Sequence, residues 1–252
     1  MIVVKELAKT YTGSVKALDG ISFDIGEGEV CGYLGANGAG KSTTIKILTG
    51  MIKPDSGYVE INGINILENG QKAKKIIGYV PESGSMFLSL TPYDFLEFVC
   101  KIYELEKSVY HKRIYDFMEM FDLANEVNTT MAGFSKGMRQ KVLIISSLIH
   151  NPDIIFWDEP LGGVDFNTNM LIRDLVKELS AGGKIILYST HVLDMVDKIC
   201  SRVIILNLGK IVYDSRFDKS ENMPVENIFR QYMDAEAGKN KAAEIYKNLN
   251  NR

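Results

Sequence analysis

A glycine-rich segment from Gly35 to Ser42 constrains the fold of this chain more than any other feature of its sequence. Its residues, Gly-Ala-Asn-Gly-Ala-Gly-Lys-Ser, fit the pattern G-x-x-x-x-G-K-[ST] in full. An apolar run over residues 30–34 predicts a buried strand before it, and apolar spacing after Lys41 predicts a helix that ends at Gly50. Glycines in such a loop let the backbone curl, so that successive N–H groups point at phosphate oxygens above the positive end of the helix. The segment therefore predicts a site for a nucleoside triphosphate.

Each residue of this loop has an expected role. We expect the Lys41 ammonium to reach the β- and γ-phosphates and the Ser42 hydroxyl to ligate Mg²⁺. The alternative is a chance glycine-rich turn, which the strand before the loop and the helix after it argue against. The pattern does not distinguish adenine from guanine. The residues expected to bind the nucleotide here are Gly35, Asn37, Gly38, Ala39, Gly40, Lys41, Ser42 and Thr43.

A second apolar run ends in two carboxylates. Residues 154–157 predict a buried strand, with Trp157 in the core, and Asp158 and Glu159 follow directly. Ligands of open α/β sheets bind at the carboxyl ends of the strands. We therefore expect Asp158 to hold Mg²⁺, directly or through water, and Glu159 to act as general base on the attacking water. Adjacent carboxylates are common on surfaces, and only the strand and the upstream loop set this pair apart.

Composition and charge argue against several other classes of protein, although a local basic patch remains an alternative. The formal net charge of −3 argues against a general nucleic-acid-binding protein, which carries a basic excess. The three cysteines are far apart and form no C-x-x-C pair, so they indicate neither a disulfide framework nor a zinc site. The longest aliphatic run, residues 142–149, is too short for a bilayer, which takes about 20 residues. We expect neither a secretory signal nor a membrane span.

Strand patterns alternate with helical patterns on both sides of a helical middle segment. The first part of the chain predicts short strands, and the alternation resumes after Asn151. Strands separated by helices imply a largely parallel sheet covered on both faces. The expected strands are residues 30–34, 58–61, 75–80, 154–157, 185–188, 203–208 and 210–213, the last two joined at Gly209.

The middle segment has its own helix signals. Thr91 and Pro92 predict a helix start, a capping hydroxyl followed by proline at the first helical position. Two apolar stripes at helical spacing follow, and we expect both to pack against other helices. The stripes are Phe95, Phe98, Val99 and Ile102, then Ile114, Phe117, Met118 and Phe121. Near the C-terminus, residues 225–233 predict a short amphipathic helix.

Further motifs follow in a fixed order. Residues 134–140, Phe-Ser-Lys-Gly-Met-Arg-Gln, resemble the signature motif of ATP-binding-cassette (ABC) ATPases, although the family's Leu-Ser-Gly-Gly-Gln becomes Phe-Ser-Lys-Gly-Met. Residues 161–165 resemble the family's D-loop, and residues 189–191, Ser-Thr-His, resemble its switch histidine at a strand end. Tyr11 matches the aromatic residue that stacks on adenine. With the motifs at Lys41 and Asp158, the chain resembles an ABC ATPase from Met1 to about Asp214.

The resemblance implies a fold and a division into domains. The fold would be α/β, with a P-loop NTPase (RecA-like) core, an N-terminal antiparallel β subdomain and an inserted α-helical signature subdomain. The ATPase domain would cover residues 1–218, with the helical subdomain at about 84–150. A C-terminal helical extension would cover residues 219–252.

The resemblance also implies roles for single residues. ATP would be the nucleotide, with Tyr11 stacked on adenine; packing is the alternative for a lone tyrosine. His191 would donate a hydrogen bond to the γ-phosphate and so take part in catalysis. Asp165 would be the aspartate of the D-loop. The signature residues, which would contact an ATP bound by a second chain, are Ser135, Lys136, Gly137 and Met138.

One functional position departs from the wider family. Residues 78–82, Gly-Tyr-Val-Pro-Glu, resemble the Q-loop, with Glu82 where glutamine is commonest. A carboxylate there adds negative charge near the γ-phosphate, which would either bind Mg²⁺ more firmly or repel the phosphate. Our hypothesis is that Glu82 contacts the metal and relays the state of ATP to a partner.

Partners follow from the resemblance as well. One P-loop and one signature motif per chain imply a two-fold dimer, of like or unlike chains, with two composite ATP sites. A transmembrane permease in another chain would hold the dimer on the cytoplasmic face of the membrane. The residues around Ser135 resemble those of ABC-2-type exporters. No nucleic-acid partner is implied. The alternatives are an ABC ATPase acting on a soluble or cell-envelope assembly, and a P-loop kinase, which leaves the signature motif unexplained.

Overall fold

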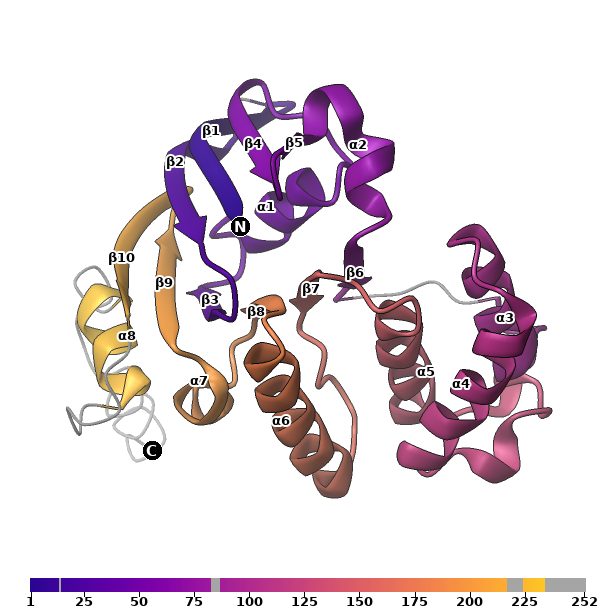
Figure 1. Cartoon of the computed structure of the whole chain (residues 1–252). Helices are drawn as coiled ribbons and strands as arrows, with labels where there is room; N and C mark the ends of the chain where they lie inside the picture. Colours follow the sequence, from indigo (N-terminus) through magenta and orange to yellow (C-terminus); the bar gives the residue numbers. More distant parts are fainter. Residues whose placement is uncertain (14, 83–86, 217–223, 234–252) are drawn as a thin grey trace, which may run out of the picture.

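Two sheets organise the part of the chain that the computed structural model describes, residues 1–13, 15–82, 87–216 and 224–233 (Figure 1). The four-stranded sheet has the order β2-β1-β4-β5 and is antiparallel. The six-stranded sheet has the order β10-β9-β3-β8-β7-β6, and only the hairpin of β9 and β10 is antiparallel in it. The strands are β1 (Ile2–Tyr11), β2 (Val15–Ile25), β3 (Val30–Gly35), β4 (Ser56–Ile61), β5 (Ile64–Asn65), β6 (Ile77–Val80), β7 (Ile154–Asp158), β8 (Ile185–Ser189), β9 (Arg202–Asn207) and β10 (Lys210–Arg216).

The large sheet is buried on both faces, and its side chains alternate between two cores. Every residue of β3, β7 and β8 is buried. In β7, Ile155 and Trp157 belong to one core, whereas Ile154 and Phe156 belong to the other. The alternation follows from the period of two along a strand. It explains why these strands are continuous apolar runs in the sequence.

Helices cover the sheet on both sides and form a group of their own at one end. The antiparallel sheet and α1 lie over one face, and α6 and α7 lie over the other (Figure 1). The helices α3, α4 and α5 stand apart from the antiparallel sheet (Figure 1). The helices are α1 (Lys41–Leu48), α2 (Ile66–Lys74), α3 (Pro92–Ile102), α4 (Lys107–Met120), α5 (Lys136–Leu148), α6 (Phe166–Ala181), α7 (Leu193–Ile199) and α8 (Val225–Met233), with 3₁₀ turns at Ala124–Glu126 and Met131–Gly133.

The expected α/β fold, with a mainly parallel core and an antiparallel sheet, is confirmed. The hairpin at Gly209, the Thr91 cap and the helix at 225–233 are also as predicted. The Thr91 hydroxyl accepts a hydrogen bond from the Asp94 N–H at 3.1 Å. No helix among the described residues is long and apolar enough to span a membrane. Of the extension expected over 219–252, only α8 and the residue before it lie within the described part of the chain.

Three details differ from the sequence predictions. The first strands are long rather than short, because β1 and β2 pair antiparallel over 10 and 11 residues. The strand expected from Lys75 begins at Ile77. The helix α2 was not expected, because its residues are mostly polar and only Ile66 and Ala73 are buried.

The prediction that the first apolar stripe of the middle segment packs against other helices was wrong in part. Phe98 and Ile102 are 49% and 59% exposed, whereas Leu96 and Cys100 are completely buried. The helix therefore turns the face of Leu96 and Cys100 toward α4 and α5. Apolar residues lie almost all round α3, so spacing alone did not identify the inner face. The second stripe packs inward as expected, with Ile114, Phe117, Met118 and Phe121 in one core.

Candidate functional site

The glycine-rich loop joins β3 to α1 at the carboxyl edge of the large sheet. Gly40 has a φ of 112°, and a Cβ there would lie 2.4 Å from the Ala17 carbonyl oxygen. Both facts require glycine at this position. Lys41 is only 8% exposed, and its ammonium donates to the carbonyl oxygens of Gly35 at 2.7 Å and Ala36 at 3.2 Å. The lysine is therefore held inside the curled loop.

The N-terminus of α1 offers N–H groups to a ligand. The first N–H groups of a helix have no partner within the helix. Gly40, the residue before α1, provides no side-chain cap, and the first turn contains no acidic residue. Unpaired N–H groups and the helix dipole together favour an anion at this point.

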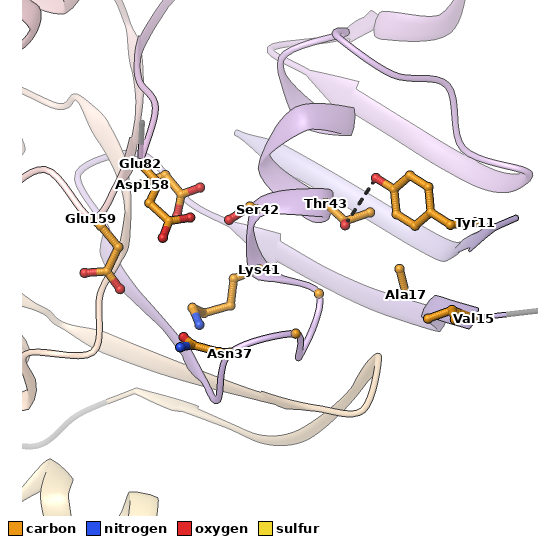
Figure 2. A pocket seen from close by; sticks show the side chains of 12 residues that line it. Tyr11, Val15, Ala17, Asn37, Lys41, Ser42, Thr43, Glu82, Asp158 and Glu159 are labelled. Carbon is orange, nitrogen blue, oxygen red and sulfur yellow. Dashed lines mark hydrogen bonds between the residues drawn. The ribbon is translucent and has the colours of Figure 1, made fainter. Parts of the chain in front are cut away.

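A cleft of about 360 Å³ opens beside the loop (Figure 2). Tyr11 stands at one end and the three carboxylates of Glu82, Asp158 and Glu159 gather at the other, with Lys41 between them (Figure 2). The aromatic end of the cleft suits a base, and the Lys41 ammonium next to it suits phosphates. Its lining residues are Tyr11, Val15, Ala17, Asn37, Gly38, Gly40, Lys41, Ser42, Thr43, Glu82, Asp158 and Glu159.

The first end of the cleft presents an exposed aromatic ring. Tyr11 is 43% exposed, and its hydroxyl lies 3.4 Å from the Thr43 Oγ1. Val15 lies directly opposite Tyr11 in the β1–β2 pairing and is 62% exposed. Val15 and Ala17 were missed by the sequence analysis, because their approach to Tyr11 depends on the pairing of β1 with β2. Together these side chains form an apolar surface suited to a flat base.

Three carboxylates meet at the second end because neighbouring parallel strands end there. Val80 lies opposite Trp157 in the β6–β7 pairing, so Glu82 and Asp158 emerge at the same edge. Asp158 is 2% exposed, and its Oδ1 has no hydrogen-bond partner among the described residues. A buried carboxylate oxygen without a partner is costly, and a cation is the kind of group that it would bind.

The phenol of Tyr79, which the charges at this acidic end influence, keeps its proton. Burial, with smaller contributions from the negative charges of Asp158 and Glu82, raises the pKa of the Tyr79 phenol to about 12. Because the phenol stays neutral at physiological pH, it adds no charge beside the carboxylates.

Glu159 is held in a strained conformation against His191. Its φ is 51°, in the left-handed region that non-glycine residues seldom adopt. The Glu159 N–H donates to the Ser189 carbonyl at 2.9 Å. The carboxylate Oε1 lies 2.8 Å from His191 Nδ1, and Oε2 accepts from the Thr190 hydroxyl at 3.2 Å. The structure thus brings together the two predicted catalytic residues, and Thr190 is a neighbour that the sequence analysis missed.

The signature residues lie elsewhere in the chain. Ser135 caps α5, and its hydroxyl accepts from the Met138 N–H at 3.2 Å. None of Ser135, Lys136, Gly137 and Met138 is among the described residues that line the cleft. One chain therefore does not bring its own signature motif to its own Lys41.

Asp165 also lies outside the cleft and begins a helix instead. It caps α6, accepting from the Thr168 N–H at 2.9 Å, and its Oδ2 lies 3.0 Å from the Lys141 ammonium. These hydrogen bonds, led by the one from the Thr168 N–H, hold the pKa of the Asp165 carboxyl well below its usual value.

The fold and the cleft define a class of protein. A G-x-x-x-x-G-K-S loop between a strand and a helix, with carboxylates on adjacent parallel strands, is the site of a P-loop nucleoside triphosphatase.

Comparison with known proteins gives the family. The ABC transporter family profile matches residues 18–162, more than half of the chain. An uncharacterized ABC transporter ATP-binding protein of Methanocaldococcus jannaschii is 39% identical over 92% of this chain and 83% of its own length. The ABC transporter ATP-binding protein NatA of Bacillus subtilis is 33% identical over 85% of this chain and 89% of its own length. The chain belongs to the ABC transporter ATP-binding proteins.

Two further comparisons bear on activity and assembly. A solved dimeric cassette in a post-hydrolysis state, bound to ADP and phosphate, is 28% identical with a TM-score of 0.80, over 86% of this chain and 99% of that one. The Nod factor export ATP-binding protein I of Ralstonia nicotianae is 31% identical over 83% of this chain and 65% of its own length. The chain is the ATP-binding and ATP-hydrolysing subunit of an ABC transporter.

Proposed function

We propose that this chain powers an exporter by hydrolysing ATP in two composite sites, each built by Lys41 of one chain and Ser135 of another. The strongest support comes from the residues that line the cleft. They include the glycine-rich loop, the tyrosine at the base-stacking end and the carboxylates, but none of the signature residues, Ser135 to Met138. A second chain related by a two-fold axis supplies what the first lacks. The dimeric relative bound to ADP and phosphate is consistent with this arrangement.

Mg²⁺ fits the acidic end of the cleft. The unpartnered Asp158 Oδ1 is a hard oxygen ligand, and the Ser42 hydroxyl and Glu82 carboxylate line the same cleft. We assign these three residues to the ion, directly or through water. When bound, the ion neutralises charge on the phosphates. Glu82 brings one more negative charge than the family's glutamine would.

The roles of the remaining residues follow from their positions. The α1 N–H groups and Lys41 bind the phosphates, and Tyr11 stacks on adenine. Glu159 takes the proton of the attacking water, and His191, now against Glu159, turns to the γ-phosphate once ATP is bound. Ser135 and the N-terminus of α5 cap the partner-bound γ-phosphate. Hydrolysis removes the charge that joins the two chains, which lets the dimer open.

A second cavity is suited to the membrane partner. About 360 Å³ in volume, it lies between the end of α1, β6, α3 and α5. Its rim carries exposed apolar side chains, among them Met51 and Ile102. Nearby, the ring of Phe98 packs edge-on against that of Phe87, with 6.5 Å between the ring centroids. An exposed apolar surface of this kind marks an interaction site. We assign it to an apolar cytoplasmic segment of a transmembrane permease, which holds the ATPase domain, residues 1–218, at the membrane through its helical subdomain, about 84–150.

Export is supported by relatives. One relative is named for the export of Nod factor, and another, of Bacillus subtilis, for resistance to linearmycin. The second candidate, an ABC ATPase acting on a soluble or cell-envelope assembly, requires no apolar docking surface for a membrane partner.

Affinity purification from detergent-solubilised membranes tests this assignment. We expect a membrane-spanning protein, identified by mass spectrometry, to co-purify with the wild-type chain and with Val109→Asp, a control on the exposed side of α4. We expect Ile102→Asp to lose it while keeping basal ATP hydrolysis, because a charge on the rim opposes an apolar contact. Equal recovery with both variants, or recovery of soluble proteins alone, would contradict a permease at this surface.

A further inference from the structure

Ser189 ends β8 at the carboxyl edge of the large sheet, between the strand of the glycine-rich loop and the strand of Asp158. It lies opposite Asp158 in the β7–β8 pairing and opposite Tyr33 in the β3–β8 pairing. Side chains two residues apart on a strand, and side chains paired across strands, point to the same face. Tyr33 and Leu187 both belong to the core that contains the apolar side chains of α1. The Ser189 side chain therefore lies on the face of the sheet that α1 and its loop cover.

Two buried oxygen atoms without partners lie on these neighbouring strand ends. Ser189 is completely buried, and its Oγ has no hydrogen-bond partner among the described residues. The Oδ1 of Asp158, across the β7–β8 pairing, also lacks a partner in the described part of the chain. Each atom has lost its hydrogen bonds to water, which is costly unless another group replaces them. The pair is suited to a group that hydrogen-bonds to both oxygens.

The chemistry of the two oxygens narrows the choice of that group. An ionised carboxylate only accepts hydrogen bonds, whereas a hydroxyl both accepts and donates. A water molecule whose lone pair binds a cation has two protons to donate, one for each of these oxygens. Mg²⁺ dehydrates reluctantly and keeps several waters when carboxylates hold it. A water of the hydration shell of the ion therefore fits Ser189 and Asp158 together.

We propose that Ser189 is a positioning residue of the metal site, where it shares with Asp158 one water molecule of the Mg²⁺ hydration shell. The inference deepens the proposed function, because it rests on the assignment of Asp158 to the ion. The Ser189 carbonyl also accepts from the Glu159 N–H at 2.9 Å. One residue thus fixes the hydrated ion and the backbone of the general base relative to each other.

Binding of Mn²⁺ in the presence of ADP tests the proposal in the full chain. Mn²⁺ prefers the same oxygen ligands as Mg²⁺, and electron paramagnetic resonance measures the free ion. Ser189→Ala removes the hydroxyl, and Ser147→Ala is the matched control. Ser147 is also a buried serine, but its hydroxyl donates to the Ile144 carbonyl at 2.7 Å and accepts from the Trp157 indole at 3.1 Å. The thermal unfolding midpoint without metal is measured for each variant.

For Ser189→Ala we expect the dissociation constant of Mn²⁺ to rise about three- to tenfold, as for the loss of one hydrogen bond, with metal-free ADP binding unchanged. The unfolding midpoint without metal should not fall, because the variant removes an oxygen that is buried without a partner. Ser147→Ala should show the opposite pattern. Its midpoint should fall, because the Trp157 N–H loses its acceptor, while its Mn²⁺ affinity stays at the wild-type value.

Asp158→Asn separates failure of this inference from failure of the metal assignment. If Asp158→Asn binds Mn²⁺ with ADP as tightly as the wild type, the ion lies elsewhere and both proposals fail. If Asp158→Asn weakens binding while Ser189→Ala leaves it unchanged, this inference alone is overturned. It is also overturned if Ser189→Ala lowers the metal-free midpoint as far as Ser147→Ala does, because the Ser189 hydroxyl would then serve the fold instead of the ion.

Discussion

At the scale of single residues, the site contains charged groups that the fold holds in costly positions. Lys41 donates to carbonyl oxygens of its own loop, and Asp158 Oδ1 has no partner among the described residues. Glu159 has a strained backbone and contacts His191 at 2.8 Å. Such strain and unsatisfied burial persist where the surrounding structure fixes them for function. These residues are therefore positioned before ATP arrives.

Glu159→Gln tests the general base. We expect ATP hydrolysis to fall about 10²- to 10⁴-fold, because an amide cannot take the proton of the attacking water. ATP binding should persist, since the loop and Lys41 are unchanged. Single-turnover hydrolysis and ATP binding measure the two effects, with Glu178→Gln on α6 as the control. If Glu159→Gln hydrolysed ATP at nearly the wild-type rate, a residue other than Glu159 would be the general base.

Tyr11→Ala tests the stacking end of the cleft. Base–aromatic stacking contributes about 1–3 kcal/mol, so we expect the dissociation constant for ADP to rise at least about fivefold. Tyr11→Phe keeps the ring and loses only the 3.4 Å contact with Thr43, so its affinity should stay close to that of the wild type. Calorimetry with ADP measures both, and equal losses for alanine and phenylalanine would indicate that the hydroxyl matters instead of the ring.

At the scale of elements, the strands fix where the site residues meet. The sequence was sufficient for β3, β7 and β8, because strands buried on both faces are continuous apolar runs. It was sufficient for the glycine-rich loop and for the two carboxylates at the end of β7, Asp158 and Glu159, because their pattern is local. It was not sufficient for the inner face of α3 or for α2, because both depend on which neighbours pack against them. The contribution of Val15 and Ala17 depends on β1–β2 pairing, which no single segment shows.

His150, just after α5, contacts β6 and the end of α3, and the contribution of these contacts to stability depends on pH. Its Nε2 lies 3.0 Å from the Ile77 carbonyl of β6, and its ring stacks on Tyr103 of the α3 end at 3.7 Å. Burial lowers the pKa of His150 from 6.5 to about 4. As pH falls below 6.5, the unfolded chain binds the proton first, so this contribution to stability is complete above pH 6.5 and is lost between pH 6.5 and about 4.

His150→Gln should remove that pH dependence. Glutamine can still donate to the Ile77 carbonyl but does not titrate. We expect the free energy of unfolding of the wild type, measured by urea denaturation, to fall relative to the variant as pH drops from 6.5 toward 4. Parallel pH profiles for the two proteins would show that His150 is not protonated preferentially in the unfolded chain.

At the scale of the whole molecule, our proposal gives each chain half of each ATP site. The cleft beside Lys41 and the signature motif at Ser135 are separate surfaces of the described structure. In the proposed assembly a two-fold dimer unites them, and ATP between the chains contributes the negative charge that both surfaces bind. The apolar cavity beside α3 lies on a third surface, so closing the dimer leaves it accessible to a permease in our proposal.

Sedimentation of Glu159→Gln with ATP and Mg²⁺ tests the composite site most directly. The comparison is Glu159→Gln combined with Ser135→Asp, in which aspartate keeps the cap of α5 but places a carboxylate against the partner-bound γ-phosphate. We predict that Glu159→Gln forms a dimer with ATP and returns to monomers when ATP is removed, and that the double variant stays monomeric although it binds ATP. A strictly monomeric Glu159→Gln under saturating ATP, or a dimer that Ser135→Asp does not weaken, would contradict the account.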